Sequence, residues 1–459
     1  MPRLRQVLVG TAAAILCYQL ILPPVTGLAN NGDFAKVLGR FDLWAKTPRV
    51  YAFCDTVYEF DHSRHWVSDF YSTEITLAGA AVALNSLLSK DGNFDLRAIG
   101  LVHGALFLLA LWLLVPLLAQ TSRRTRVSVC ALVLLFYCDP MYVSGLNSFY
   151  MDEPTYLFLL LSAVFYLRAI RWRRPGDAVG LAVCAALMTA AKTQHALLPL
   201  WIAILLAVNA KLLWPGKTRW LRAIAILPMA VALFMMTKAV PWDYAGFPVY
   251  NVTFFQILPH AKDRDRTLAE LGLDASYRQY IGKGAYFAGS GMDDPAFERE
   301  FSRRLSMGKL AVFYLRHPRD TWQTLVTALS EAGRQRDFGN FDPSAGYRPM
   351  AETQAFRWWS DLKRRALLKR GHRFLWTIVS LSAALAALLY RQRGILPPGT
   401  VSGGYALIGM TLTEMAVSSL ADAMDVVRHH LIFYALFDMM LLAAVAVALA
   451  SGERGERNG

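Results

Sequence analysis

Long apolar segments recur along the whole chain, separated by short runs of arginine and lysine. A helix needs about 20 apolar residues to span a bilayer, and ten segments come close to that length. They lie at 7–29, 98–119, 127–146, 154–170, 177–191, 195–210, 220–240, 373–390, 401–420 and 429–450. The sequence therefore predicts an all-α fold, a polytopic transmembrane helical bundle of about ten spans. We expect the first segment to stay as a span and not to be removed as a signal peptide.

The charged residues support this prediction and indicate how the chain is oriented. Only 18% of the 459 residues are charged, against about 25% in soluble domains. Much of the net charge of +14 lies in short loops, where lysine and arginine resist translocation and mark the cytoplasmic side. It therefore indicates topology and does not indicate a nucleic acid partner. The basic loops contain Arg3 and Arg5; Arg123, Arg124 and Arg126; Arg168, Arg171, Arg173 and Arg174; Lys211, Lys217, Arg219 and Arg222; Arg391 and Arg393; and Arg454 and Arg457.

The stretch 178–210 decides whether this orientation is consistent. As one helix it would be about 50 Å long, which exceeds a hydrocarbon core of about 30 Å. The tetrapeptide Lys192-Thr193-Gln194-His195 interrupts it midway, so two short spans joined by a polar elbow fit better. With two spans, all the basic loops fall on one face. We then expect a multi-pass protein of the bacterial inner (cytoplasmic) membrane with both termini in the cytoplasm.

Three polar regions fall on the opposite, periplasmic face. The first contains an apolar stretch at 75–88, too short to span, which predicts an interfacial helix. The second, at 138–153, has no lysine or arginine. The third is long enough for a small domain, with predicted helices at 295–305, 308–316 and 320–334. The expected organisation is an N-terminal transmembrane module at 1–240 with its first outer loop at 30–97, a periplasmic helical loop domain at 241–372, and C-terminal transmembrane helices at 373–459.

Acidic residues stand at two places on this periplasmic face. Asp33 follows the first span directly, and partial desolvation at the lipid–water boundary would make it a better general base. An ordinary loop aspartate or a helix N-cap would give the same pattern. Asp152 and Glu153 begin the fourth span. Acids in a first turn are a normal helix start, yet paired carboxylates on the same face as Asp33 also suit an acceptor or a divalent cation.

Basic and imidazole groups occupy two further positions near the same face. Lys192 and His195 interrupt an apolar run, and ionisable groups in such a place suggest function by default, here the binding of a lipid-borne phosphate. Snorkelling of the lysine to the interface is the simpler interpretation. Asp425, Arg428 and His429 precede the final span, with the first and last spaced as an i,i+4 pair. They suit either an interfacial ion pair or a bidentate grip of the arginine on phosphate.

Two more features lie near the C-terminal spans. Asp438 lies inside the final apolar segment and is a candidate functional group for that reason. Trp358 and Trp359 precede a basic run in a region where the orientation rule is weak, and together they favour an interfacial amphipathic helix over a substrate-phosphate site. The basic run consists of Lys363, Arg364, Arg365, Lys369, Arg370 and Arg373.

Together, these features resemble the GT-C glycosyltransferases, which use sugars carried on polyprenyl phosphate. The resemblance is architectural and covers most of the chain. The matching features are an aspartate just after the first span, at Asp33; interfacial helices in the same loop, at about 40–90; an acidic site between spans three and four, at Asp152 and Glu153; and a large outer loop, at 241–372. The 191–194 elbow and the segment 425–438 are similar to a bacterial hexose-transferase branch tied to surface-glycan assembly.

The resemblance implies a hexosyltransferase that moves a sugar from a polyprenyl-phosphate carrier to an extracytoplasmic glycan or lipid acceptor. Asp33 would deprotonate or orient the acceptor hydroxyl, and Asp152 or Glu153 would fix the acceptor. Lys192 and Arg428, with His429, would neutralise the leaving phosphate. The aromatic residues that could stack on sugar rings or anchor the loop at the interface are Trp44, Tyr51, Tyr58, Trp66 and Tyr71.

The expected partners are the lipid-linked sugar, the acceptor and membrane lipid. No cofactor is required by the pattern, and a divalent cation, Mg²⁺ or Mn²⁺, is an open alternative. The first loop lacks the adjacent Asp-Asp or Asp-x-Asp pair of the GT-C family, and this departure counts against a metal-dependent mechanism.

Other functions are also consistent with the pattern. An O-antigen ligase or polymerase has many spans and a large outer loop as well, and would make Arg316 and His317 central. A lipid or solute transporter would place polar groups near mid-membrane and show paired halves. Here the polar residues gather at one face and the sequence shows no matching halves. A non-catalytic scaffold is a further alternative.

Overall fold

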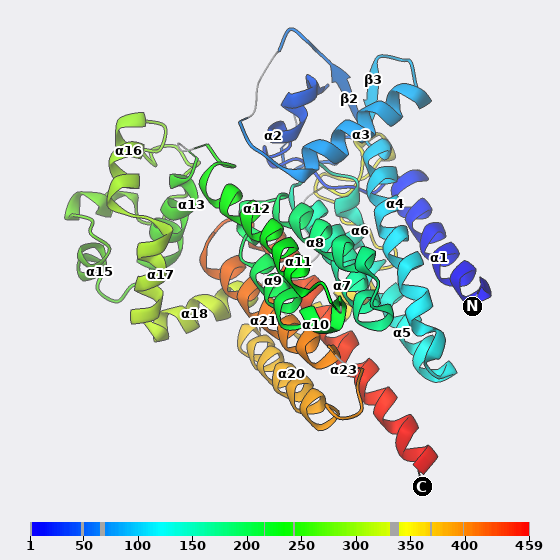
Figure 1. Cartoon of the computed structure of the whole chain (residues 1–459). Coiled ribbons are helices and arrows are strands. Elements are labelled where there is room, and N and C mark those ends of the chain that lie inside the picture. The colour runs from blue at the N-terminus through cyan, green and yellow to red at the C-terminus, as the bar shows by residue number, and fades with distance from the viewer. Residues whose placement is uncertain are drawn as a thin grey trace.

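A computed structural model describes residues 2–46, 50–64, 69–214, 216–241, 244–330, 339–367, 370–397 and 399–458. Helices account for most of these residues, and three short strands lie in the first outer loop (Figure 1). Six helical segments are long and apolar enough to cross a bilayer, and a bent pair could make a seventh. A transmembrane helical fold therefore fits the chain, whereas the count of ten spans stays a prediction. The six segments are Arg3–Ile21, Arg97–Ala119, Asp152–Trp172, Thr218–Thr237, Gly371–Arg391 and Leu431–Ala450.

The helical bundle brings both halves of the chain around one apolar core. Helices α7 and α8 pack together closely, and α23 packs against α20 and α21. The helices of the N-terminal half are α1 (Pro2–Leu16), η1 (Cys17–Ile21), α4 (Arg97–Leu114), η3 (Val115–Gln120), α5 (Arg123–Tyr137), α6 (Pro140–Leu146), α7 (Asp152–Trp172), α8 (Pro175–Thr189), η4 (Thr193–His195), α9 (Leu198–Val208), α10 (Ala210–Leu213), α11 (Thr218–Ile224) and α12 (Ile226–Thr237). Those of the C-terminal half are α20 (Gly371–Arg391), α21 (Thr400–Leu420), α22 (Val426–His429) and α23 (Leu431–Asn458).

The polar elbow in the stretch 178–210 is confirmed. Helix α8 ends at Thr189, the short 3-10 turn η4 follows, and α9 begins at Leu198 with Pro199 in its first turn. Lys192 has an extended backbone, with φ at −154°, and so cannot continue the α-helix. The break places the side chains of Lys192 and His195 where two helices end, and this location positions the site described below.

The first outer loop contains a small sheet that the sequence did not predict. Its elements are α2 (Ala35–Leu38), η2 (Gly39–Phe41), β1 (Leu43–Ala45), β2 (Val57–Phe60), α3 (Thr73–Leu88) and β3 (Asn93–Asp95). The strands are antiparallel in the order β1-β2-β3. The prediction of interfacial helices over 40–90 is therefore wrong for its first part, which contains β1 and β2. Tyr58 on β2 and Phe94 on β3 turn inward onto Phe149. Alternation on strands this short gives a weak sequence signal.

The segment from α13 to α18 forms a lobe beside the bundle (Figure 1). Aromatic residues of α13, η5 and α16 form its core, which is separate from the core of the bundle. The predicted helices at 295–305 and 308–316 are confirmed. The third begins after the predicted break at His317 and ends at Leu329, and residues 331–334 of its predicted range lie outside the described residues. The elements of the lobe are α13 (Gly246–Tyr250), η5 (Asn251–Ile257), α14 (Leu258–His260), α15 (Arg264–Glu270), η6 (Ala275–Tyr280), α16 (Pro295–Arg304), α17 (Met307–Arg316) and α18 (Pro318–Leu329). Between the lobe and α20, the chain forms η7 (Pro343–Ala345) and α19 (Trp358–Ala366).

Helix α19 docks into the bundle through a buried ion pair. Lys363 Nζ lies 3.0 Å from Asp438 Oδ2, and both side chains are almost fully buried. The same carboxylate oxygen accepts from Trp359 Nε1 at 2.8 Å and from Tyr142 OH at 2.6 Å. The prediction of an interfacial amphipathic helix therefore needs correction, because one face of α19 is inside the protein while Trp358 on the other face is exposed. Lys369 lies outside the described residues.

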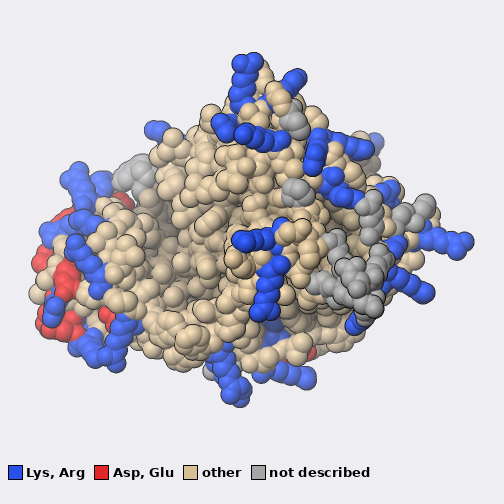
Figure 2. Space-filling view, turned by 60° about the horizontal axis from the view of Figure 1, so that its bottom comes forward, with Lys and Arg blue, Asp and Glu red and all other residues tan. Residues whose placement is uncertain are grey.

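The charged side chains are distributed unevenly over the molecule. Both termini lie on the side of Figure 1 opposite β2 and β3. Turning that side forward exposes many lysine and arginine side chains on a mostly uncharged surface, and the acidic side chains in view gather on the lobe (Figure 2). The basic loops are the ones predicted to lie on the cytoplasmic face. The assignment itself stays a prediction.

Candidate functional site

The segment after the first span holds Asp33 in a fixed turn. Asn30 Oδ1 accepts from the backbone N–H groups of Gly32 at 2.8 Å and Phe34 at 3.2 Å, and Asn31 Oδ1 accepts from the N–H of Asp33 at 3.1 Å. Asparagine side chains commonly form such local turns. Phe34 is buried against Tyr150. The turn therefore anchors its apolar side in the core of the first loop and leaves the Asp33 side chain 20% exposed.

Two cations bind the two oxygens of the Asp33 carboxylate. Lys36, at the start of α2, donates to Oδ1 at 2.6 Å. Arg428 of α22 forms an ion pair with Oδ2. Burial raises the pKa of Asp33, but Arg428 and Lys36 outweigh this effect and hold the pKa well below its usual range. Asp33 is therefore ionised at neutral pH.

Arg428 connects Asp33 to two other aspartates. Its Nε lies 3.0 Å from Asp425 Oδ2 and 4.0 Å from Asp152 Oδ2, and its guanidinium carbon lies 5.0 Å from the centre of the Tyr150 ring. The predicted i,i+4 pair of Asp425 with His429 is thus replaced, because Asp425 turns to Arg428 and to the amide of Asn31 at 3.0 Å. One arginine gathers carboxylates from three parts of the chain.

Asp152, the first residue of α7, is fully buried and pairs with the elbow after α8. Lys192 Nζ lies 2.8 Å from Asp152 Oδ1, and His195 Nε2 lies 3.5 Å from the same oxygen. On the other side of the imidazole ring, His195 Nδ1 lies 2.8 Å from Glu414 Oε1 of α21. A buried carboxylate needs such compensation. The elbow supplies it, which explains why a lysine and a histidine interrupt an apolar stretch.

His429 completes the group from the last loop. Its Nδ1 lies 2.6 Å from Gln194 Oε1 and 3.1 Å from Lys192 Nζ, while Nε2 lies 3.3 Å from Asp422 Oδ2. Burial lowers the pKa of His429, and the neighbouring Lys192 lowers it further, in spite of Asp422. The imidazole is therefore neutral at neutral pH. We call the whole group the charged cluster, which consists of Asp33, Lys36, Asp152, Lys192, His195, Glu414, Asp422, Asp425, Arg428 and His429.

The structure brings together seven of the candidate site residues from the sequence, while Glu153, His317 and Asp438 make their described contacts elsewhere. Glu153 turns toward α6, where a Cβ added to Gly145 would overlap its carboxylate. His317 belongs to the lobe, where its ring stacks on Phe313 at 4.2 Å and its Nε2 lies 2.9 Å from Glu270. Neither contact involves the charged cluster. The seven that meet are Asp33, Asp152, Lys192, His195, Asp425, Arg428 and His429.

Sequence reasoning missed three members of the charged cluster, which are Lys36, Glu414 and Asp422, and it also missed the neighbouring Tyr244. Lys36 stands three positions after Asp33, a spacing at which helical neighbours pair. Glu414 is the single acid in the apolar segment 401–420, and intramembrane acids suggest function, so a signal was present for both. Tyr244, whose hydroxyl accepts from Lys36 Nζ at 2.9 Å, follows a span without any distinguishing pattern.

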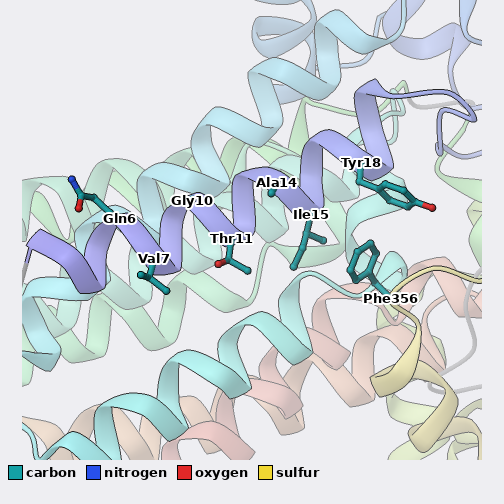
Figure 3. Close-up of a pocket in the computed structure, with 8 residues that line it drawn as sticks. All are labelled: Gln6, Val7, Gly10, Thr11, Ala14, Ile15, Tyr18 and Phe356. Atoms are coloured by element: carbon teal, nitrogen blue, oxygen red, sulfur yellow. The ribbon is translucent and has the colours of Figure 1, made fainter.

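Among the described residues, the structure contains no group of three or more histidine, cysteine or acidic side chains arranged to hold a metal ion. A groove of about 540 Å³ follows the surface of α1 and η1 from Gln6 to Tyr18 and is also lined by Phe356 (Figure 3). Its described lining residues include none of the charged cluster.

The bundle and its apolar segments define a helical transmembrane protein with ionisable groups gathered where several helices end. Residues 3–457 match the family described as YfdI N-terminal transmembrane domain, and the protein belongs to that family. No curated protein and no solved structure matches the chain.

Proposed function

We propose that this protein is a membrane glycosyltransferase of the GT-C type that moves a sugar, a hexose, from a polyprenyl-phosphate carrier to a glycan or lipid acceptor. The observation that carries the proposal is the convergence of Asp33 with Arg428, Asp152 and Lys192. A carboxylate next to clustered cations suits a reaction that takes a proton from a hydroxyl and releases a phosphate.

In this reaction, Asp33 accepts the proton of the acceptor hydroxyl. The acceptor oxygen then forms a bond to the anomeric carbon of the sugar, and the bond between that carbon and the phosphate oxygen breaks. The electron pair leaves with the phosphate, so negative charge develops on the leaving group. Arg428 and Lys192 lie within the same cluster to neutralise this charge.

The ion pair between Arg428 and Asp33 implies that the donor binds before the acceptor is deprotonated. A carboxylate held by two cations is a weak base, because both cations favour its ionised form. When a carrier phosphate takes over the guanidinium of Arg428, Asp33 keeps only Lys36 and becomes more basic. Binding of the donor therefore prepares the base for the acceptor.

The reaction takes place on the periplasmic face of a bacterial inner membrane in this proposal. The basic loops and both termini would be cytoplasmic, and ten spans would place the charged cluster on the opposite side. The lobe would then be periplasmic. A ligase or polymerase centred on His317 has less support, since this ring pairs with Glu270 and stacks on Phe313.

The test is transfer by the purified protein with a panel of radiolabelled polyprenyl-phosphate sugars. Wild type should transfer label from one of them to an outer-membrane glycan fraction, and Asp33→Asn should lose at least a hundredfold in rate, on the order of the contribution of a general base. The matched control is Asp61→Asn, which alters an exposed ion pair in the same loop. Transfer by Asp33→Asn at the wild-type rate would exclude Asp33 as the base.

A further inference from the structure

A glycine-rich loop of the lobe borders the charged cluster. The residues after Ile281 read Gly-Lys-Gly-Ala-Tyr-Phe-Ala-Gly-Ser-Gly, and Gly282, Gly289 and Gly291 have positive φ angles that favour glycine. A Cβ added to Gly284 would lie 3.1 Å from the sulfur of Met424. Because Met424 stands between Asp422 and Asp425, the loop lies directly against the segment that carries part of the cluster.

This loop presents an aromatic ring next to a stack of two others. The Tyr286 side chain is 58% exposed, and its ring lies 5.2 Å from that of Phe247. Phe247 stacks on Tyr244 at 5.6 Å with an interplanar angle of 11°. Phe70 of the first outer loop meets Tyr244 edge-on at 5.1 Å. An aromatic surface thus extends from the lobe to the first outer loop.

Hydrogen bonds join this aromatic surface to Asp33. Tyr286 donates its hydroxyl to Tyr244 OH at 3.1 Å, which also accepts from Lys36 Nζ at 2.9 Å, and Lys36 binds Asp33 Oδ1. Arg428 binds the other oxygen, Oδ2. The aromatic surface and the arginine therefore approach Asp33 at different oxygens of its carboxylate.

We propose that Tyr286, Phe247 and Tyr244 form the binding site for the sugar of the acceptor, an inference that rests on the proposed transferase function. Flat aromatic rings cover the apolar C–H face of a sugar ring, and hydroxyl and ammonium groups at their edge meet the sugar hydroxyls. The position fits the acceptor better than the donor, because the donor phosphate needs Arg428 and Lys192. Asp33 lies between the two and can take a proton from a sugar held on the aromatic side.

The experiment uses the purified full-length protein in detergent with the polyprenyl-phosphate sugar found active and, as acceptor probe, oligosaccharides released from bacterial lipopolysaccharide by mild acid. Tyr286→Ala should raise the acceptor KM about threefold to tenfold, the range expected for losing one aromatic stacking contact, while the donor KM stays unchanged. Tyr286→Phe keeps the ring and should stay within about twofold of wild type. Phe287→Ala is the matched control, since this exposed neighbour packs on Phe255 instead.

Saturation-transfer NMR with the same oligosaccharides measures sugar binding at this site in the absence of donor and turnover. Signals from the bound sugar should weaken in Tyr286→Ala and persist in Phe287→Ala. If wild type transfers sugar but Tyr286→Ala keeps the wild-type acceptor KM, the aromatic site is wrong and the transferase proposal stands. If wild type transfers no sugar from any carrier, the transferase proposal is wrong, and the NMR signals of Tyr286→Ala still test the aromatic site by itself. Equal loss in both alanine variants would indicate membrane anchoring by the loop and would overturn the sugar site.

Discussion

Arg428, just before the last span, forms an ion pair with Asp33, just after the first, across 395 positions of sequence. The pair closes the bundle, because it joins the two ends of the chain's membrane region at one site. It also makes the arginine the partner of the residue proposed as the base.

Replacing Arg428 by lysine should damage the reaction although the positive charge is kept. Lysine cannot reach Asp33, Asp425 and a phosphate with the planar fork of the guanidinium. We expect kcat/KM for the lipid-linked sugar to fall by about a hundredfold, as for loss of a donor to a developing charge. Steady-state kinetics with Arg266→Lys, an exposed arginine paired with Glu270, provide the control. A wild-type value for Arg428→Lys would contradict the phosphate role.

The pH dependence should shift when Lys36 is replaced by methionine. Arg428 and Lys36 hold the pKa of Asp33 below its usual range, so the acid limb of the wild-type rate profile lies at low pH. Removing Lys36 raises this pKa, and the acid limb should move to higher pH. The measurement is the pH profile of kcat/KM, with Lys262→Met at an exposed position as control.

Thermal unfolding of Lys36→Met at different pH values tests the pKa shift of Asp33 independently of activity. Because the folded-state pKa of Asp33 lies below that of the unfolded chain, its ionisation stabilises the fold above the unfolded-state pKa and this contribution is lost as the pH falls through the folded-state pKa. Lys36→Met should therefore lose part of its stability at a higher pH than wild type. An unshifted acid limb in both measurements would show that Lys36 does not control Asp33.

Glu414→Gln should slow the reaction from inside the bundle. Glu414 contacts His195, which contacts Asp152, so its charge fixes the imidazole that faces the site. We expect kcat to fall about tenfold to a hundredfold with little change in either KM, by analogy with outer carboxylates that orient histidine. Glu300→Gln, in an exposed pair with Arg304, is the control. If Glu414→Gln lowers thermal stability and kcat stays at the wild-type value, the role of Glu414 is structural.

The buried pair of Lys363 and Asp438 should matter for stability and not for transfer. Lys363→Met leaves a buried carboxylate without its cation, which typically costs about 3–5 kcal/mol. The double variant Lys363→Met/Asp438→Asn removes the charge but keeps an oxygen that accepts from Trp359 and Tyr142. Its melting temperature in detergent should recover most of the loss. The exposed pair of Arg278 and Asp265, changed to Met and Asn, should have little effect.

Much of the bundle could be predicted because each feature had a local cause. Apolar length indicated the spans, and the polar residues at 192–195 predicted the break before α9. The sheet of the first loop could not be predicted, since its strands are three or four residues long and pair residues that are 13 or more positions apart. The docking of α19 was missed for another reason. A basic run with two tryptophans reads as an interfacial helix unless its partner, Asp438, is known to face it.

Most residues of the site could be predicted from the sequence, but their pairing could not. Asp33, Asp152, Lys192 and Arg428 stood out because ionisable groups beside apolar segments are costly. Their pairing depends on how spans far apart in sequence pack together, and no local pattern encodes that packing. The pairing of Asp425 with His429 was predicted from their local spacing alone. In the structure, Asp425 pairs with Arg428 instead.

The pairing of Lys363 with Asp438 has a consequence for how the protein is made. An aspartate near the centre of a span costs about 2.5–3.5 kcal/mol on insertion, so Asp438 makes insertion of α23 by itself less favourable than its apolar residues alone would. Its counter-charge comes from α19, which is synthesised earlier. We therefore expect membrane assembly to follow a fixed order, in which α19 is already folded when the last span takes its final position in the bundle. A chain in which α19 failed to dock would expose this aspartate to lipid and become recognisable to membrane quality control.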